Sequence, residues 1–166
     1  TIGKERFPIT QRLEVFGCSC CPPNIVRFIP SIADMAYGYN EDTLFVHQYM
    51  NSEASYHDIR IIQKTRYPVD GIISITCDCS RKQIALRIPG WCKSFKLNQP
   101  YELKNGYAYA EINGKTEILL ELDMPVVLMS ANRQVHECAG RIAVMRGPVV
   151  YCIEGVDNGD DLKRVA

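Results

Sequence analysis

Apolar residues recur at spacings of three and four after residue 24, which predicts an amphipathic helix with one buried stripe. Pro22 and Pro23 suit the first turn of such a helix, because that turn does not use their missing N–H groups. Pro30 should kink or break the helix, and Gly38 and Asn40 are plausible end signals. The predicted stripe consists of Ile25, Phe28, Ile29, Ile32, Met35 and Ala36.

From residue 43 onward the pattern changes to short runs in which apolar and polar residues alternate. Gly, Pro, Asn or Asp bounds each run, as is typical of strands joined by turns. The sequence therefore predicts a mainly β chain, an antiparallel β-sandwich over residues 43–166 that is preceded by one helix. The predicted strand runs are TLFVHQYM, SYHDIRIIQKTRYP, GIISITCDCS, KQIALRIPGW, KSFKL, GYAYAEI, EILLELDM, VVLMSA and RIAVMRGPVVYCIE.

The alternation also predicts which side chains face the core, since every second residue of a strand lies on the same face. Arg87 should point away from the core, between apolar neighbours that point inward. Two cysteines of the ISITCDCS run should be buried thiols on the core face. The predicted inward sets are Ile84, Leu86 and Ile88; Ile118, Leu120, Leu122 and Met124; and Ile73, Ile75, Cys77 and Cys79.

Charge argues against two classes of partner. The 166 residues carry 19 basic and 19 acidic side chains, so the formal net charge is zero. Proteins that bind nucleic acid or anionic membranes usually carry a net positive charge, so neither partner is expected.

No apolar run is long enough to span a bilayer, and the opening TIGKERFPITQR lacks the apolar stretch of a signal peptide. A start at Thr1 suggests a segment of a longer protein, with any targeting signal lost.

Eight cysteines are too few for a disulfide scaffold of this length. Cys18, Cys20 and Cys21 are so close together that they would be strained disulfide partners for one another. Free thiols in a reducing compartment are the better interpretation, which favours a cytoplasmic location over an oxidising one.

The segment GCSCCPPN places Cys20 and Cys21 directly before the predicted helix. A helix amino terminus favours negative charge, so a thiolate nucleophile would be stabilised there. Two adjacent thiolates could also bind zinc with ligands from elsewhere, although no second C-x-x-C pair follows. The residues alone leave these two functions open beside a third possibility, crowded and inert thiols.

The other candidates are weaker. Solvated or hydrogen-bonded side chains are a simpler interpretation than catalytic ones for His47, His57 and His136. Trp91 suits a packing role in the sandwich, but an aromatic ring beside a loop can also contact a sugar.

Four stretches of the chain, in order, resemble the C-terminal half of the beta-L-arabinofuranosidase family of glycoside hydrolases (family 127). They are CSCCPPNIVRFIPSIADMAYGYNEDTLFVHQYMNSEA, TRYPVDG, LRIPGWC and RIAVMRGPVVYCIE, and the most specific motifs are C-C-P-P-N and R-G-P-x-V-Y. The resemblance implies that residues 1–42 are the last part of an (α/α)6 catalytic barrel and that residues 43–166 form the sandwich that follows it.

By the same resemblance, Cys20 is the nucleophile of a retaining glycosidase and Cys21 is a zinc ligand, with both thiols in the metal site. The remaining zinc ligands, a glutamate and a cysteine, and the acid/base glutamate would lie upstream, in the barrel that this chain lacks. We therefore expect this chain alone to be inactive and to hold zinc weakly or not at all. The implied substrate is an arabinofuranoside.

Two other functions remain open from the sequence. One is a non-catalytic carbohydrate-binding or structural sandwich, in which Trp91, Tyr107 or Tyr109 would contact sugar. The other is an interaction module that zinc stabilises, which a chelator would unfold. Unpaired strand edges and an apolar helix stripe also make a homo-oligomer possible.

Overall fold

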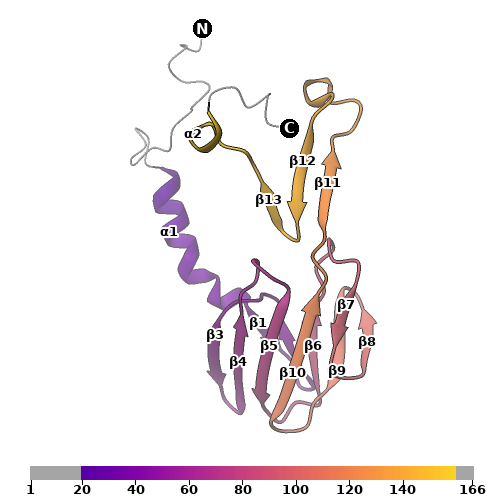
Figure 1. Ribbon diagram of the computed structural model, residues 1–166. Helices are drawn as coiled ribbons and strands as arrows, with labels where there is room; N and C mark the ends of the chain where they lie inside the picture. The colour runs from indigo at the N-terminus through magenta and orange to yellow at the C-terminus, as the bar shows by residue number, and fades with distance from the viewer. Residues whose placement is uncertain (1–19, 160–166) are drawn as a thin grey trace.

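A computed structural model describes residues 20–159, so Cys18 and both ends of the chain lie outside the described residues (Figure 1). The helices are α1 (Cys21–Ser31), η1 (Ala33–Met35), η2 (His136–Cys138) and α2 (Gly155–Asn158). The strands are β1 (Tyr37–Tyr39), β2 (Thr43–Val46), β3 (Ser52–Tyr56), β4 (Ile59–Thr65), β5 (Ile72–Asp78), β6 (Gln83–Arg87), β7 (Phe95–Leu97), β8 (Tyr101–Lys104), β9 (Tyr107–Glu111), β10 (Thr116–Leu122), β11 (Val126–Ser130), β12 (Ile142–Arg146) and β13 (Val149–Tyr151).

Two five-stranded sheets form the sandwich. Their strand orders are β1-β2-β6-β9-β8 and β3-β4-β5-β10-β7. Strand pairing within them is antiparallel except between β2 and β6. That pair is parallel because the chain leaves the first sheet after β2, builds β3 to β5 in the second sheet, and returns at β6 in the same direction. The predicted fold class, a mainly β antiparallel sandwich after one main helix, is confirmed.

The core lies between the two sheets and contains the side chains that the alternation placed there. Ile73, Ile75 and Cys77 of β5 are fully buried, as are Ile84 and Leu86 of β6. In β10 the buried residues are Ile118, Leu120 and Leu122, while Arg87 is exposed as predicted. Branched apolar side chains on both facing sheets fill the interior, which is the main favourable contribution to folding.

The predicted helix exists, but its apolar stripe is not buried within residues 20–159. Ile25, Phe28 and Ile29 of α1 are each more than half exposed. The helix ends at Ser31, one residue after Pro30, which agrees with the predicted break. The expectation of a buried stripe therefore holds at Ala36, which is buried, and is wrong along α1, because no described element packs against that face.

The sequence prediction missed two strands, β1 and β8, and it merged β3 with β4, and β12 with β13, into single runs. Gly38 and Asn40 do not end the helix: Gly38 lies in β1, and Asn40 Oδ1 accepts hydrogen bonds from the N–H groups of Asp42 and Thr43 in the turn to β2. Gly38 also allows a close approach, since a Cβ there would lie 2.7 Å from His47 Nε2. The second missed strand, β8, is only four residues long, and all four are exposed although apolar and polar residues alternate along it.

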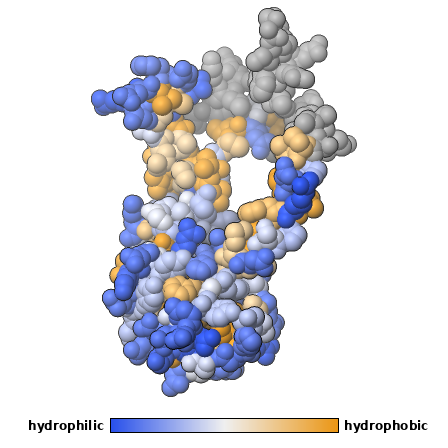
Figure 2. Space-filling model, turned by 180° about the vertical axis from the view of Figure 1, so that it is seen from behind, coloured by the Kyte–Doolittle hydropathy of each residue, from blue (hydrophilic) through white to orange (hydrophobic). Residues whose placement is uncertain are grey.

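The last three strands form a separate sheet with the order β11-β12-β13. Arg146 ties this third sheet to the sandwich by donating to the backbone carbonyl of Val69 at 2.6 Å. Every residue of β11 is exposed, and Figure 2 shows apolar surface over this region and over α1, in contrast to the more polar sandwich. The division of the chain into residues 1–42 and 43–166 stays a prediction, as does a homo-oligomer.

Among residues 20–159, no helix combines the length and the apolar character needed to cross a bilayer.

Neighbouring leucines of β10 test the inferred core. Replacing Leu120, which is fully buried, by Ala should lower the free energy of unfolding by about 2 to 5 kcal/mol, because it leaves a cavity between the sheets. The same change at Leu119, which is 38% exposed, should lower it by less than about 1 kcal/mol. Denaturant titration of both variants measures the difference, and equal losses would contradict the assigned faces.

Candidate active site

Cys20 and Cys21 lie at the amino end of α1, as the sequence predicted. Cys20 occupies the N-cap position and Cys21 is the first residue of the helix, and both side chains are exposed. Their Sγ atoms are 3.8 Å apart. Two exposed thiols are therefore adjacent in space as well as in sequence.

The local sequence explains why this pair stands at a helix start without a conventional cap. The first turn contains prolines, and no side chain caps it with a hydrogen bond. Pro22 and Pro23 have no N–H, so two of the donors that a helix start leaves unpaired are absent. The peptide dipoles of α1 still point their positive end toward the two thiols.

The geometry of the pair is compatible with a shared metal ion. Two sulfurs that each lie about 2.3 Å from a tetrahedral zinc are about 3.8 Å apart, which matches the observed separation. Within residues 20–159, however, no group of three or more His, Cys, Asp or Glu side chains could hold a metal. The pair thus supplies half of a tetrahedral shell.

Three other cysteines, Cys77, Cys79 and Cys92, are less accessible than this pair. Cys77 and Cys79 are buried in the sandwich, as predicted. Burial raises the pKa of the Cys77 thiol to about 12, with the nearby Cys79 contributing further. Cys92 is half-buried, and its Sγ donates to the backbone carbonyl of Ser94 at 3.0 Å. Burial also raises the pKa of Cys92, so neither thiol suits nucleophilic chemistry.

The histidines occupy three separate places. His47 Nδ1 and the Tyr107 hydroxyl share a hydrogen bond of 2.8 Å on the outer face of β2 and β9. Burial, followed by the charge of Arg87, lowers the pKa of His47, so the imidazole stays neutral at neutral pH. His57 lies in the turn before β4 and His136 in η2. None of the three is grouped with the cysteine pair in a candidate metal site of the described chain.

The aromatic candidates for sugar contact are largely used inside the fold. Trp91 packs against the core and stacks on Tyr67, with ring centroids 6.5 Å apart. Tyr107 and Tyr109 both pack edge-on against Phe45. Packing therefore uses part of each ring, and all three side chains are half-buried.

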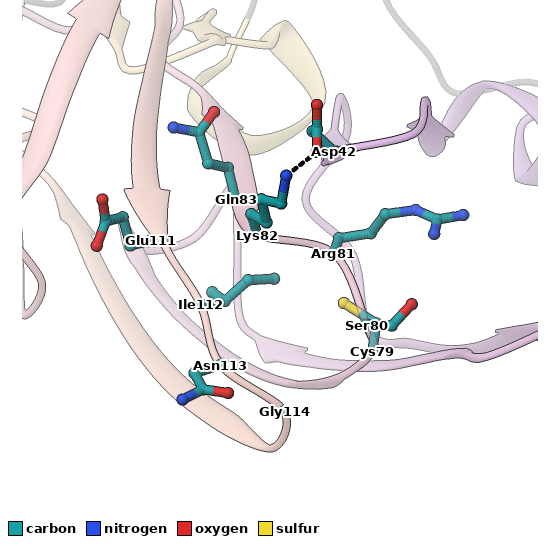
Figure 3. Close-up of a pocket in the computed structure, with 10 residues that line it drawn as sticks. All are labelled: Asp42, Cys79, Ser80, Arg81, Lys82, Gln83, Glu111, Ile112, Asn113 and Gly114. Atoms are coloured by element: carbon teal, nitrogen blue, oxygen red, sulfur yellow. Dashed lines mark ion pairs between the residues drawn. The ribbon is translucent and has the colours of Figure 1, made fainter.

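The sandwich also contains a cleft of about 640 Å³ that no sequence pattern indicated (Figure 3). Its lining comes from turns that are far apart in the chain, at Asp42, at residues 79–83 and at residues 111–114. No motif joins these residues, so only the fold could bring them together.

Comparison with known proteins gives matches over nearly all of the chain. A profile of the beta-L-arabinofuranosidase GH127 middle domain matches residues 43–126, and a profile of the glycoside hydrolase family 127 C-terminal domain matches residues 126–166. A non-reducing end beta-L-arabinofuranosidase of Bifidobacterium longum subsp. longum is 39% identical over 93% of this chain.

Solved structures agree with the sequence matches. The crystal structure of a GH127 beta-L-arabinofuranosidase from Geobacillus stearothermophilus T6 is similar over 92% of this chain, with a TM-score of 0.76 and 39% identity. A second GH127 beta-arabinofuranosidase matches 86% of it, with a TM-score of 0.70 and 30% identity. The chain spans only 26% of the Bifidobacterium protein and 27% of each of these two structures.

Alkylation should separate the exposed thiols from the buried ones. With iodoacetamide at mildly alkaline pH, native protein should be modified quickly at Cys20, Cys21 and Cys152, which are exposed. Cys77 should stay unmodified until the protein is denatured, because burial shields it and raises its pKa. Peptide mapping by mass spectrometry measures the labelling of each cysteine. Labelling of Cys77 in native protein as fast as that of Cys152 would contradict the burial of Cys77.

Proposed function

The chain belongs to glycoside hydrolase family 127, and from that premise we propose that it is the part of a retaining glycosidase that carries the nucleophile, Cys20. The proposed enzyme releases L-arabinofuranose-type sugars, which agrees with its similarity to beta-L-arabinofuranosidases. One observation supports the proposal above all others: two exposed thiols 3.8 Å apart at the amino end of a helix.

In the proposed reaction, the Cys20 thiolate attacks the anomeric carbon of the bound sugar. A C–S bond forms while the C–O bond to the leaving group breaks, and the leaving oxygen takes a proton from a general acid. Water then attacks the same carbon and gives a proton to the conjugate base of that general acid, while the C–S bond breaks and the sulfur leaves again as thiolate. Two displacements at one carbon retain its configuration.

Zinc would be held by Cys20 and Cys21, and when bound it would keep sulfur deprotonated at neutral pH. The exposed position of both side chains leaves room for further ligands and for the sugar. Cys21 has a positioning role in this proposal, since it shares the metal with Cys20 and does not itself attack.

The general acid and the remaining zinc ligands are proposed to lie outside residues 20–159. The chain spans about a quarter of the length of its relatives, so most of an enzyme of that size would come from other residues. The exposed apolar face of α1, with Ile25, Phe28 and Ile29, suits packing against such a neighbour. We propose that residues 1–42 complete the (α/α)6 barrel there and that the sandwich follows.

Substituting the nucleophile in the intact enzyme that contains this segment tests the proposal. Cys20→Ser should lower kcat/KM for a nitrophenyl β-L-arabinofuranoside by at least about 10³-fold, because a hydroxyl is far less ionised than a thiol. Cys152→Ser is the matched control, since Cys152 is also exposed but lies after β13. Full turnover by Cys20→Ser would refute the proposed role.

The chain on its own should bind zinc only weakly. Two thiols leave the metal shell incomplete, and no third protein ligand is grouped with them in the described residues. Calorimetric titration should show weak binding that Cys21→Ser abolishes and Cys152→Ser leaves unchanged. Tight one-to-one zinc binding would contradict the proposal that the other ligands lie elsewhere.

A further inference from the structure

Four turns meet at one end of the sandwich, and three of them line the cleft of Figure 3. The register shows this directly, because Tyr56 pairs with Ile59, Arg60 with Asp78, and Gln83 with both Thr43 and Glu111. The turns are therefore residues 40–42, 57–58, 79–82 and 112–115. The chain enters β1 from α1, and leaves β10 for the third sheet, at the opposite end of the strands (Figure 1). Neither α1 nor the third sheet lies at the end of the sandwich that holds the cleft.

The charged groups of the cleft are balanced against one another. Lys82 Nζ lies 2.9 Å from Asp42 Oδ1, and Figure 3 shows Lys82 reaching toward Asp42 while Arg81 extends in another direction. Arg81 Nη1 lies 3.8 Å from Asp58 Oδ2. Hydrogen bonds from the Ser80 hydroxyl and backbone N–H lower the pKa of Asp58, so that carboxylate stays charged beside Arg81. An anionic ligand would meet carboxylates as well as cations here, which favours a neutral one.

Exposed aromatic rings lie beside the cleft and link its two sheets. Tyr39 of β1 and Tyr56 of β3 come from different sheets, and their ring centroids are 5.0 Å apart. The Arg81 guanidinium, which lines the cleft, lies 5.9 Å from the Tyr39 ring centroid. Tyr39 is 49% exposed and Tyr56 is 52% exposed, so packing within the described chain uses only part of each ring.

We propose that this end of the sandwich is a binding site for a neutral oligosaccharide. The hydroxyls of a sugar need several donors and acceptors at fixed positions, and the cleft supplies charged and amide side chains such as Lys82, Glu111 and Asn113. The C–H face of a sugar ring needs an apolar, flat surface with a polar edge, which exposed tyrosines provide.

The site is independent of the catalytic proposal, because it shares no residue with the cysteine pair and lies at the other end of the strands. Its cleft, about 640 Å³, is large enough for more than one sugar unit. In a whole enzyme it would hold a glycan on the protein surface and raise the local concentration of chain ends for the active site.

Titration of the labelled 166-residue chain tests the proposal by two-dimensional NMR. The probes are arabinohexaose, xylohexaose and cellohexaose, with trigalacturonic acid and inorganic phosphate as anionic comparisons. At least one neutral oligosaccharide should bind and shift the amide signals of residues 40–42, 79–83 and 111–114. Tyr56→Ala and Lys82→Ala should each weaken that binding at least about fivefold, because they remove a ring contact and a charged donor.

Matched controls separate loss of the site from general damage. Tyr151→Ala removes a tyrosine of equal exposure, 52%, from the third sheet, and Lys104→Ala removes an exposed lysine from β8. Both should bind the oligosaccharide like the unaltered chain. Because Lys82 and Tyr56 are exposed, denaturant midpoints should confirm that both variants fold. If one variant fails to fold, the other alone still tests the site.

Three outcomes would overturn the proposal. The first is no binding by any neutral oligosaccharide at millimolar concentration. The second is binding that neither Tyr56→Ala nor Lys82→Ala weakens. The third is stronger binding of trigalacturonic acid or phosphate than of every neutral probe, which would make the cleft an anion site.

Discussion

Burial of branched apolar side chains between two sheets is the constraint on which the rest of this structure depends. Ile75 on β5 and Leu120 on β10 can both face the interior only if the strands keep their observed register. That register decides where each strand begins and ends. It thereby places α1 and the third sheet at one end of the sandwich and four turns at the other.

The sequence predicted the sandwich well where one face of a strand is buried and the other is exposed. Ile118, Leu120 and Leu122 alternate with polar or exposed neighbours, so the period of two is plain. The prediction missed β8, where all four residues are exposed. It also missed β1, because the apolar pattern of the helix continues to Ala36 and hides the start of the strand. The parallel pairing of β2 with β6 could not be predicted, since it depends on a long excursion into the other sheet.

The two sites differ in how far a sequence can reveal them. Cys20 and Cys21 are neighbours in the chain, and the prolines after them indicate a helix start, so their position could be predicted. The cleft joins Asp42, Lys82 and Glu111, which no local pattern connects. The helix stripe was predicted correctly as apolar but wrongly as buried, because the pattern of one helix does not say where its partner surface comes from.

The catalytic account rests on one sulfur atom at the positive end of a helix, with a second sulfur 3.8 Å away. Family 127 membership supports a glycosidase, and the exposed pair supports a thiolate nucleophile within it. The most direct measurement is rapid acid quenching of the intact enzyme during turnover of an arabinofuranoside, followed by peptide mapping. The account predicts a sugar bound covalently to Cys20. A sugar attached to a carboxylate side chain, or hydrolysis that inverts the anomeric carbon, would contradict it.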